Sequence, residues 1–173
     1  MSAFDFRQLI GVEARSGRVP PEAWEDIEAW AGRGLPADFK GFAERYGGGL
    51  IRGHLFVPHP CDDESLLDFM KSGRRAFEKL SRHFSDELGR ENVDPASVVP
   101  WAYSNWDGDR CFFVPGGGTS WRILLVFRQL AGVHFYDAGF LELLTGVITG
   151  TAVPPGWPHM EPAWRPIGTS PSA

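Results

Sequence analysis

A chain of 173 residues with 43% hydrophobic content is long and apolar enough for one domain with a sizeable core. It has no apolar run of about 18 residues, no leader-like N-terminus and only two cysteines, which excludes a membrane span, a signal peptide and a disulfide framework. We therefore expect a cytoplasmic protein.

The net charge of −5 is concentrated in the middle of the chain, where residues 61–114 carry 11 acids and 7 bases. Contacts to phosphates need clustered Lys and Arg, so this balance disfavours direct nucleic-acid binding. It is compatible with a basic protein partner, and equally with acidity that only serves solubility.

Three helices are predicted first, from apolar residues at helical spacing. They cover residues 4–14, residues 21–31 after a Pro-Pro pair, and residues 35–46 before three glycines. Their expected buried faces are Phe6, Leu9 and Ile10; Trp24, Ile27 and Trp30; and Leu35, Phe39, Phe42 and Tyr46.

One strand is predicted over residues 50–58, with a weak point at Gly53. The segment from Asp62 to Ser65 can cap a helix that ends at Met70. A longer helix is predicted over residues 72–88, with a buried stripe of Phe77, Leu80, Phe84 and Leu88.

The remainder reads as β-structure, with strands at residues 98–101, 111–114, 121–127 and 133–136, and then a helix over residues 140–148. Leu124 and Val126 make both faces of the third strand apolar, so it should be covered on both sides. The order of elements predicts an α+β fold with a mixed, mainly antiparallel sheet packed by helices. We expect one domain over residues 1–151 and a Pro- and Trp-rich tail over residues 152–173 that packs on it without regular structure.

Three motifs in this order resemble the SUKH domain superfamily. They are LPADFKGFAERYGGG at residues 35–49, NWDGD at residues 105–109 and FLELLTG at residues 140–146. The resemblance covers about residues 20–150, and the charged helical region at residues 62–90 and the aromatic tail depart from the pattern.

The resemblance implies a protein-binding module without catalytic activity or a cofactor. Bacterial members of the superfamily are largely immunity proteins that bind and block a toxin, often a nuclease, so the leading hypothesis is inhibition of a cognate, basic toxin. The alternative is a regulatory or scaffold domain that binds a host protein in cell-wall synthesis or signalling, as in fungal relatives. Genomic neighbourhood would separate the two.

The expected partner-binding residues combine acids with an aromatic anchor. The acids would speed the encounter with a positive groove on the partner, and a Trp in a turn-like stretch would supply buried area. Covering the edge of the sheet is the alternative role for that Trp. The residues are Asp62, Asp63, Glu64, Trp106, Asp107 and Asp109.

An enzyme or a metal site has less support from the residues. Asp107 and Asp109 form an acidic pair that can hold a metal or act in acid–base chemistry, but a Gly-containing turn explains them as well. His54, His59 and Cys61 lack the further ligands of a zinc site. Cys111 lies in an apolar strand and should be a buried small side chain. We expect no catalytic residue, metal or cofactor.

Overall fold

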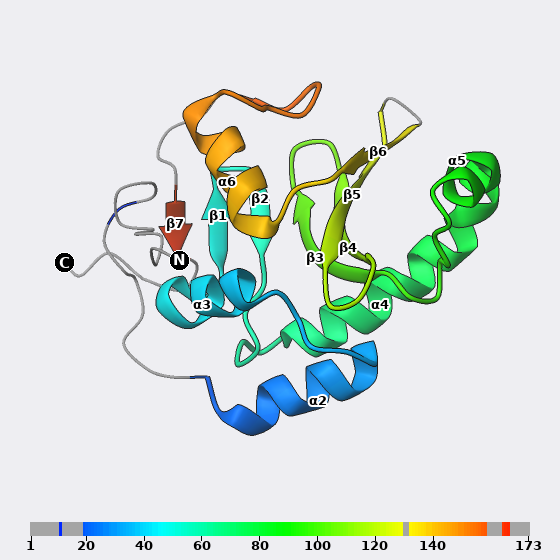
Figure 1. Cartoon of the computed structure of the whole chain (residues 1–173). Helices are drawn as coiled ribbons and strands as arrows, with labels where there is room; N and C mark the ends of the chain where they lie inside the picture. Colours follow the sequence, from blue (N-terminus) through cyan, green and yellow to red (C-terminus); the bar gives the residue numbers. More distant parts are fainter. Residues whose placement is uncertain (1–10, 12–18, 130–131, 159–163, 167–173) are drawn as a thin grey trace.

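An antiparallel sheet forms the centre of the computed structural model, which describes residues 11, 19–129, 132–158 and 164–166. The strand order is β6-β5-β4-β3-β2-β1-β7, and every neighbouring pair is antiparallel (Figure 1). The strands are β1 (Gly49–Ile51), β2 (Leu55–Val57), β3 (Val99–Ser104), β4 (Arg110–Pro115), β5 (Trp121–Phe127), β6 (Gly132–Tyr136) and β7 (Trp164–Pro166). The α+β fold is confirmed, with a sheet that is antiparallel throughout the described residues.

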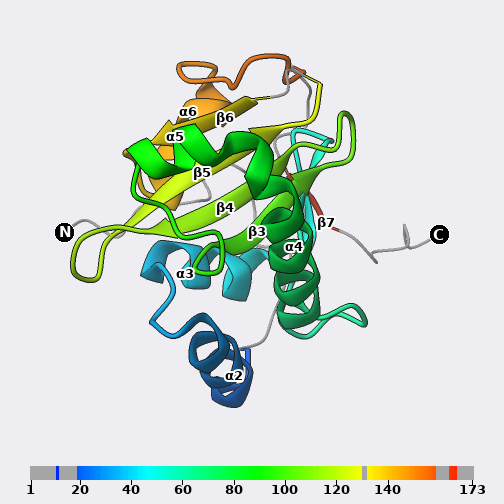
Figure 2. The same cartoon turned by 90° about the vertical axis from the view of Figure 1, so that its right-hand side faces the viewer.

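Helices lie on both faces of this sheet (Figures 1 and 2). They are α2 (Pro21–Ala31), α3 (Ala37–Tyr46), α4 (Leu66–Leu80), the 3₁₀ helix η1 (Ser81–Phe84), α5 (Ser85–Arg90) and α6 (Phe140–Thr149). The helix predicted over residues 4–14 falls outside the described residues except for Gly11. In the part of the chain that the structure describes, no helix has both the length and the apolar character needed to cross a membrane.

The larger core lies where α2, α3 and α6 pack on one face of the sheet. Phe39 is fully buried at its centre, with its ring centroid 5.2 Å from those of Phe113 and Phe140. The predicted stripe of α3 is confirmed, since its apolar residues are all buried. The stripe residues are Leu35, Phe39, Phe42 and Tyr46.

The smaller core lies on the opposite face, under α4 and α5. Leu124 and Val126 of β5 belong to it, whereas Ile123 and Leu125 face the larger core. The prediction that β5 is covered on both sides is therefore confirmed.

Helix α4 can approach the sheet closely because it has a glycine at the crossing point. A Cβ atom at Gly73 would lie 2.9 Å from Cγ and 3.0 Å from Cβ of Pro100 in β3. A proline ring cannot move aside as a flexible side chain can. Gly73 therefore sets the distance between α4 and β3.

Three predicted boundaries are wrong. The strand predicted over residues 50–58 is the hairpin of β1 and β2, because the chain reverses at Arg52, which has a φ of 49°. Helix α4 continues through Ser72, and it gives way to η1 at Ser81. The tail contains a regular element, because β7 pairs with β1.

A bulge in β3 decides which face of the sheet carries Tyr103. The pairing of β3 with β4 shifts between Pro100 and Ala102, and the consecutive residues Trp101 and Ala102 both belong to the larger core. Since side chains alternate along a strand, one extra residue moves all later ones to the other face. Tyr103 consequently lies on the α4 side, where Phe56 is its direct partner in β2.

Asp38 of α3 caps a helix other than its own. Its Oδ2 accepts a hydrogen bond of 2.9 Å from the backbone N–H of Leu141 in the first turn of α6, where Gly139 offers no side-chain cap. Asp38→Ala should lower the free energy of unfolding by about 1 kcal/mol. In a chain of this size that corresponds to a melting temperature lower by roughly 2–4 °C.

Glu142→Ala is the matched control for Asp38→Ala, because Glu142 is an exposed acid in the same first turn of α6. It should cost only a few tenths of a kcal/mol, by loss of its interaction with the helix dipole. Equal losses in the two variants, measured by thermal denaturation, would show that the bond between α3 and α6 contributes nothing beyond charge.

Candidate functional site

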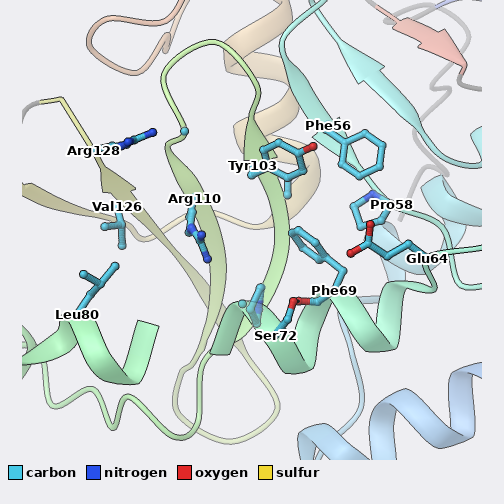
Figure 3. A pocket seen from close by; sticks show the side chains of 14 residues that line it. Phe56, Pro58, Glu64, Phe69, Ser72, Leu80, Tyr103, Arg110, Val126 and Arg128 are labelled. Carbon is cyan, nitrogen blue, oxygen red and sulfur yellow. The ribbon is translucent and has the colours of Figure 1, made fainter. Parts of the chain in front are cut away.

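An open groove of about 680 Å³ lies on the α4 side of the sheet, between α4 and strands β2 to β5 (Figure 3). Helix α4 forms one wall, with Phe69 and Ser72, and the ends of the strands form the other. The groove is the part of this sheet face that α4 and α5 leave uncovered.

A row of side chains across four strands forms the floor of the groove. Phe56 of β2 pairs directly with Tyr103 of β3, Tyr103 with Arg110 of β4, and Arg110 with Val126 of β5. Residues directly opposite each other in antiparallel strands share a face, so all four side chains point toward the groove. The ring of Tyr103 also lies 5.2 Å from that of Phe56 and 6.0 Å from that of Phe69.

Exposed apolar side chains are concentrated at this groove. Among the described residues three large hydrophobic side chains are exposed: Trp106 by 65%, Leu80 by 43% and Tyr103 by 37%. Leu80 and Tyr103 line the groove, and Trp106 stands on the turn whose Gly108 borders it. The prediction that Leu80 belongs to a buried stripe is wrong, because α4 ends at this residue.

The turn that carries Trp106 is held by hydrogen bonds from several directions. The Gly108 N–H donates to the Ser104 carbonyl at 2.9 Å, and the Asn105 N–H donates to the carbonyl of His54 in the β1–β2 hairpin at 2.8 Å. The buried Ser104 hydroxyl accepts from the Trp106 N–H at 3.3 Å. Gly108 has a φ of 78°, which favours glycine. The Trp106 side chain therefore projects from a fixed backbone.

Asp109 anchors the same turn from inside the protein. Its side chain is 3% exposed, and it accepts hydrogen bonds from the Arg128 N–H at 2.9 Å and from Nε1 of Trp157 at 3.0 Å. The tail thus contributes a buried Trp to the support of the turn. Asp109 was predicted as a partner-binding residue, but its carboxylate is not available at the surface.

His54 lies beneath the turn as a buried, uncharged side chain. Its Nδ1 is 3.3 Å from the Ser104 hydroxyl, and its ring meets that of Trp157 edge-on at 5.1 Å. Burial first, and the Arg52 charge second, together lower the pKa of His54 to about 4, while Asp107 acts in the opposite direction. The imidazole is therefore neutral near pH 7.

The other predicted site residues lie at or beside the groove. Glu64 lines it from the α4 side, and Asp63 is exposed next to Glu64. Asp62 is partly exposed, and its Oδ2 accepts from the His59 N–H at 3.1 Å. Asp107 is partly buried on the turn beside Trp106. Of the predicted site residues only Glu64 is part of the groove lining, and the segment at residues 105–109 reaches the groove through Gly108.

The alternative chemical sites have other roles in the structure. Among the described residues no three His, Cys, Asp or Glu side chains form a group that could hold a metal. His59 Nδ1 accepts from the Cys61 N–H at 3.1 Å. Cys111 is fully buried, as predicted, and burial raises the pKa of its thiol well above the usual value.

Sequence reasoning missed the groove residues Tyr103, Arg110 and Arg128. In the sequence, the polar Arg110 at the start of the strand after the NWDGD turn is the only sign of a polar groove residue. No sequence feature indicates the bulge in β3 that brings Tyr103 to the groove. Comparisons of the chain with protein-family models, curated proteins and solved structures gave no match.

Proposed function

We propose that this protein is a protein-binding module, and specifically a bacterial immunity protein that inhibits a cognate toxin. The observation that carries the proposal is that exposed Tyr103 and Leu80 line one open groove, and that exposed Trp106 stands on the turn whose Gly108 borders it. Exposed aromatic residues on a rigid backbone are typical anchors of protein interfaces, because they bury a large area at little entropic cost. The motifs similar to the SUKH superfamily support the finer assignment.

The geometry favours binding over catalysis at this site. The acidic pair that an enzyme would need does not converge on the groove, since Asp109 bonds to Trp157 and to the Arg128 backbone inside the protein. Small-molecule sites are usually concave pockets that enclose most of the ligand. This groove is open, and its aromatic floor is shielded from water only when a partner covers it. We propose a cytoplasmic location with this function, because the two cysteines, Cys61 and Cys111, are both free thiols.

The test uses the product of the gene next to this one. Purified wild-type protein should form a stoichiometric complex with that product and block its toxic activity. Trp106→Ala should weaken the complex about 30-fold, on the order of 2 kcal/mol, measured by calorimetric titration. The reason is that the indole is exposed in the free protein and should be buried in the complex.

Trp106→Phe is the conservative control and should keep most of the affinity, because it retains an aromatic ring on the same backbone. Unchanged melting temperatures would show that neither variant perturbs the fold. Absence of a complex with the wild-type protein would contradict the immunity function. If the complex forms and Trp106→Ala does not weaken it, only the assignment of Trp106 to the contact surface is contradicted.

A further inference from the structure

Two arginines on the β4 and β5 side of the groove have no partner within the described part of the chain. Neither guanidinium group of Arg110 or Arg128 makes an ion pair or a hydrogen bond there, and both residues are exposed. Several other described arginines are engaged, although exposed Arg45, Arg75 and Arg82 also make no side-chain hydrogen bond or ion pair among the described residues. Arg33 donates to the carbonyls of Gly118 and Ser120, Arg52 to those of Val147 and Ile148, Arg74 to that of Val98, and Arg122 to Glu91 and Asp137.

Both arginine side chains line the groove from fixed backbone positions. Arg110 occupies the floor between Tyr103 and Val126. Arg128 lies across the turn, since a Cβ atom at Gly108 would be 3.1 Å from its Cδ. Arg128 is also fixed through its own N–H, which donates to Asp109. The groove lining therefore carries two positive charges, one on its floor and one beside the turn.

Charges of opposite sign lie on opposite sides of the groove. Arg110 and Arg128 lie on the side of β4 and β5, Glu64 lies on the opposite side, and the rings of Tyr103 and Phe69 lie between them (Figure 3). Strands β2 and β5 are three strand spacings apart, or about 14 Å, which an extended segment of four to five residues spans. The groove therefore distinguishes the two directions of a charged segment.

We infer that the groove binds a segment of the partner protein that carries an acidic side chain opposite Arg110 and Arg128 and an apolar side chain over Tyr103. This inference rests on the proposed function and names the chemistry of its contact surface. It differs from the expectation of a purely basic partner, because the acids at residues 62–64 and the two arginines call for both signs on the partner.

The physical reasons are complementary. The aromatic floor provides contact area, and guanidinium groups pair with a carboxylate through two parallel hydrogen bonds. Because the chain has a net charge of −5, an acidic segment is repelled over most of the surface and attracted near Arg110 and Arg128. This difference between repulsion elsewhere and attraction at the arginines determines how the partner segment is positioned in the groove more than it raises the affinity.

The experiment is a selection of displayed random twelve-residue peptides on the full-length protein. We expect the enriched peptides to combine Asp or Glu with an aromatic or large aliphatic residue. Synthetic copies of these peptides should bind the variant Arg110→Gln/Arg128→Gln at least about tenfold more weakly than wild type. Arg75→Gln/Arg82→Gln removes the same charge from exposed residues outside the groove lining and should change binding less than twofold.

Three results would overturn the inference: no enrichment, enriched peptides without acidic residues, or equal binding to wild type and to the groove variant. A wild-type dimer that dissociates in the groove variant would also overturn it, since the occupant would then be a second copy.

The outcome of this experiment can be separated from the outcome of the test of the proposed function. If Trp106→Ala weakens the toxin complex but the groove variant does not, only the inference fails. If acidic peptides bind as expected but no toxin complex forms, only the immunity function fails.

Discussion

Replacing Asp109 with alanine should lower the free energy of unfolding by about 3 kcal/mol. The buried carboxylate accepts one hydrogen bond from the Arg128 N–H and one from Nε1 of Trp157. Alanine would leave both donors buried without an acceptor, and each such donor costs on the order of 1–3 kcal/mol. Urea denaturation at neutral pH measures the loss directly.

Two further variants show how much of the lost free energy of unfolding comes from each of the two hydrogen bonds. Asp109→Asn keeps one acceptor oxygen and should lose about half as much. Trp157→Phe removes the indole donor while it keeps a ring against His54. In a double-mutant cycle, Asp109→Ala and Trp157→Phe should show a coupling energy of about 1 kcal/mol or more. If Asp109→Ala is as stable as wild type within about 0.5 kcal/mol, the carboxylate does not anchor the turn.

The larger core could be predicted from the sequence because its helices are amphipathic, and because prolines and glycines mark the ends of α2 and α3. Phe39 and Phe42 recur at helical spacing between Pro36 and Gly47, and the structure buries both. Strand β5 was equally clear, because seven residues of alternating and then continuous apolar character follow a glycine-rich turn.

The missed features depend on single backbone conformations. Arg52 adopts a positive φ at the hairpin, which is uncommon for a non-glycine residue, and its neighbour Gly53, with a φ of 72°, is the one sign of the turn in the sequence. The three residues of β7 pair with β1 in a proline-rich stretch that carries no strand pattern. The side chains of such short elements do not show periodicity, so tertiary contacts decide them.

The candidate site was predictable only in part. The sequence indicates Glu64 as an acid for the partner and Trp106 as an aromatic anchor; Glu64 lines the groove, and Trp106 is exposed on the turn that borders it. Asp109 was indistinguishable from Asp107 in the sequence, because burial depends on Trp157, which lies 48 residues further along the chain. Tyr103 reaches the groove through a bulge in β3 that shifts the register by one residue, whereas Arg110 reaches it by regular alternation along β4.

The second large effect concerns pH. The pKa of His54 is lowered to about 4 in the folded protein, mainly by burial, from an ordinary value of 6.5. Between these two values the unfolded chain binds a proton that the folded chain does not. Stability should therefore fall as the pH falls from about 6.5 to about 4, by roughly 2–3 kcal/mol from this one group. Above pH 6.5 its contribution is constant.

His54→Gln should remove this part of the pH dependence. The charged groups that act on the imidazole are Arg52, whose positive charge opposes protonation, and Asp107, whose negative charge favours it. The quantity to measure is the difference in the free energy of unfolding between pH 7 and pH 4.5. Wild type should lose about 2 kcal/mol more than His54→Gln over this interval. His83→Gln removes an exposed histidine and should behave as wild type.

Nuclear magnetic resonance supplies an independent measure, because the His54 ring signals should titrate with a midpoint near pH 4 in the folded protein. Parallel stability curves for wild type and His54→Gln, or a midpoint near 6.5, would contradict the prediction. If the prediction is correct, acid also acts on the binding surface. A charge on His54 next to Arg52 would destabilise the hydrogen bonds of Ser104 and Asn105 that hold Trp106 in place. Affinity for the partner should then fall over the same pH interval as stability.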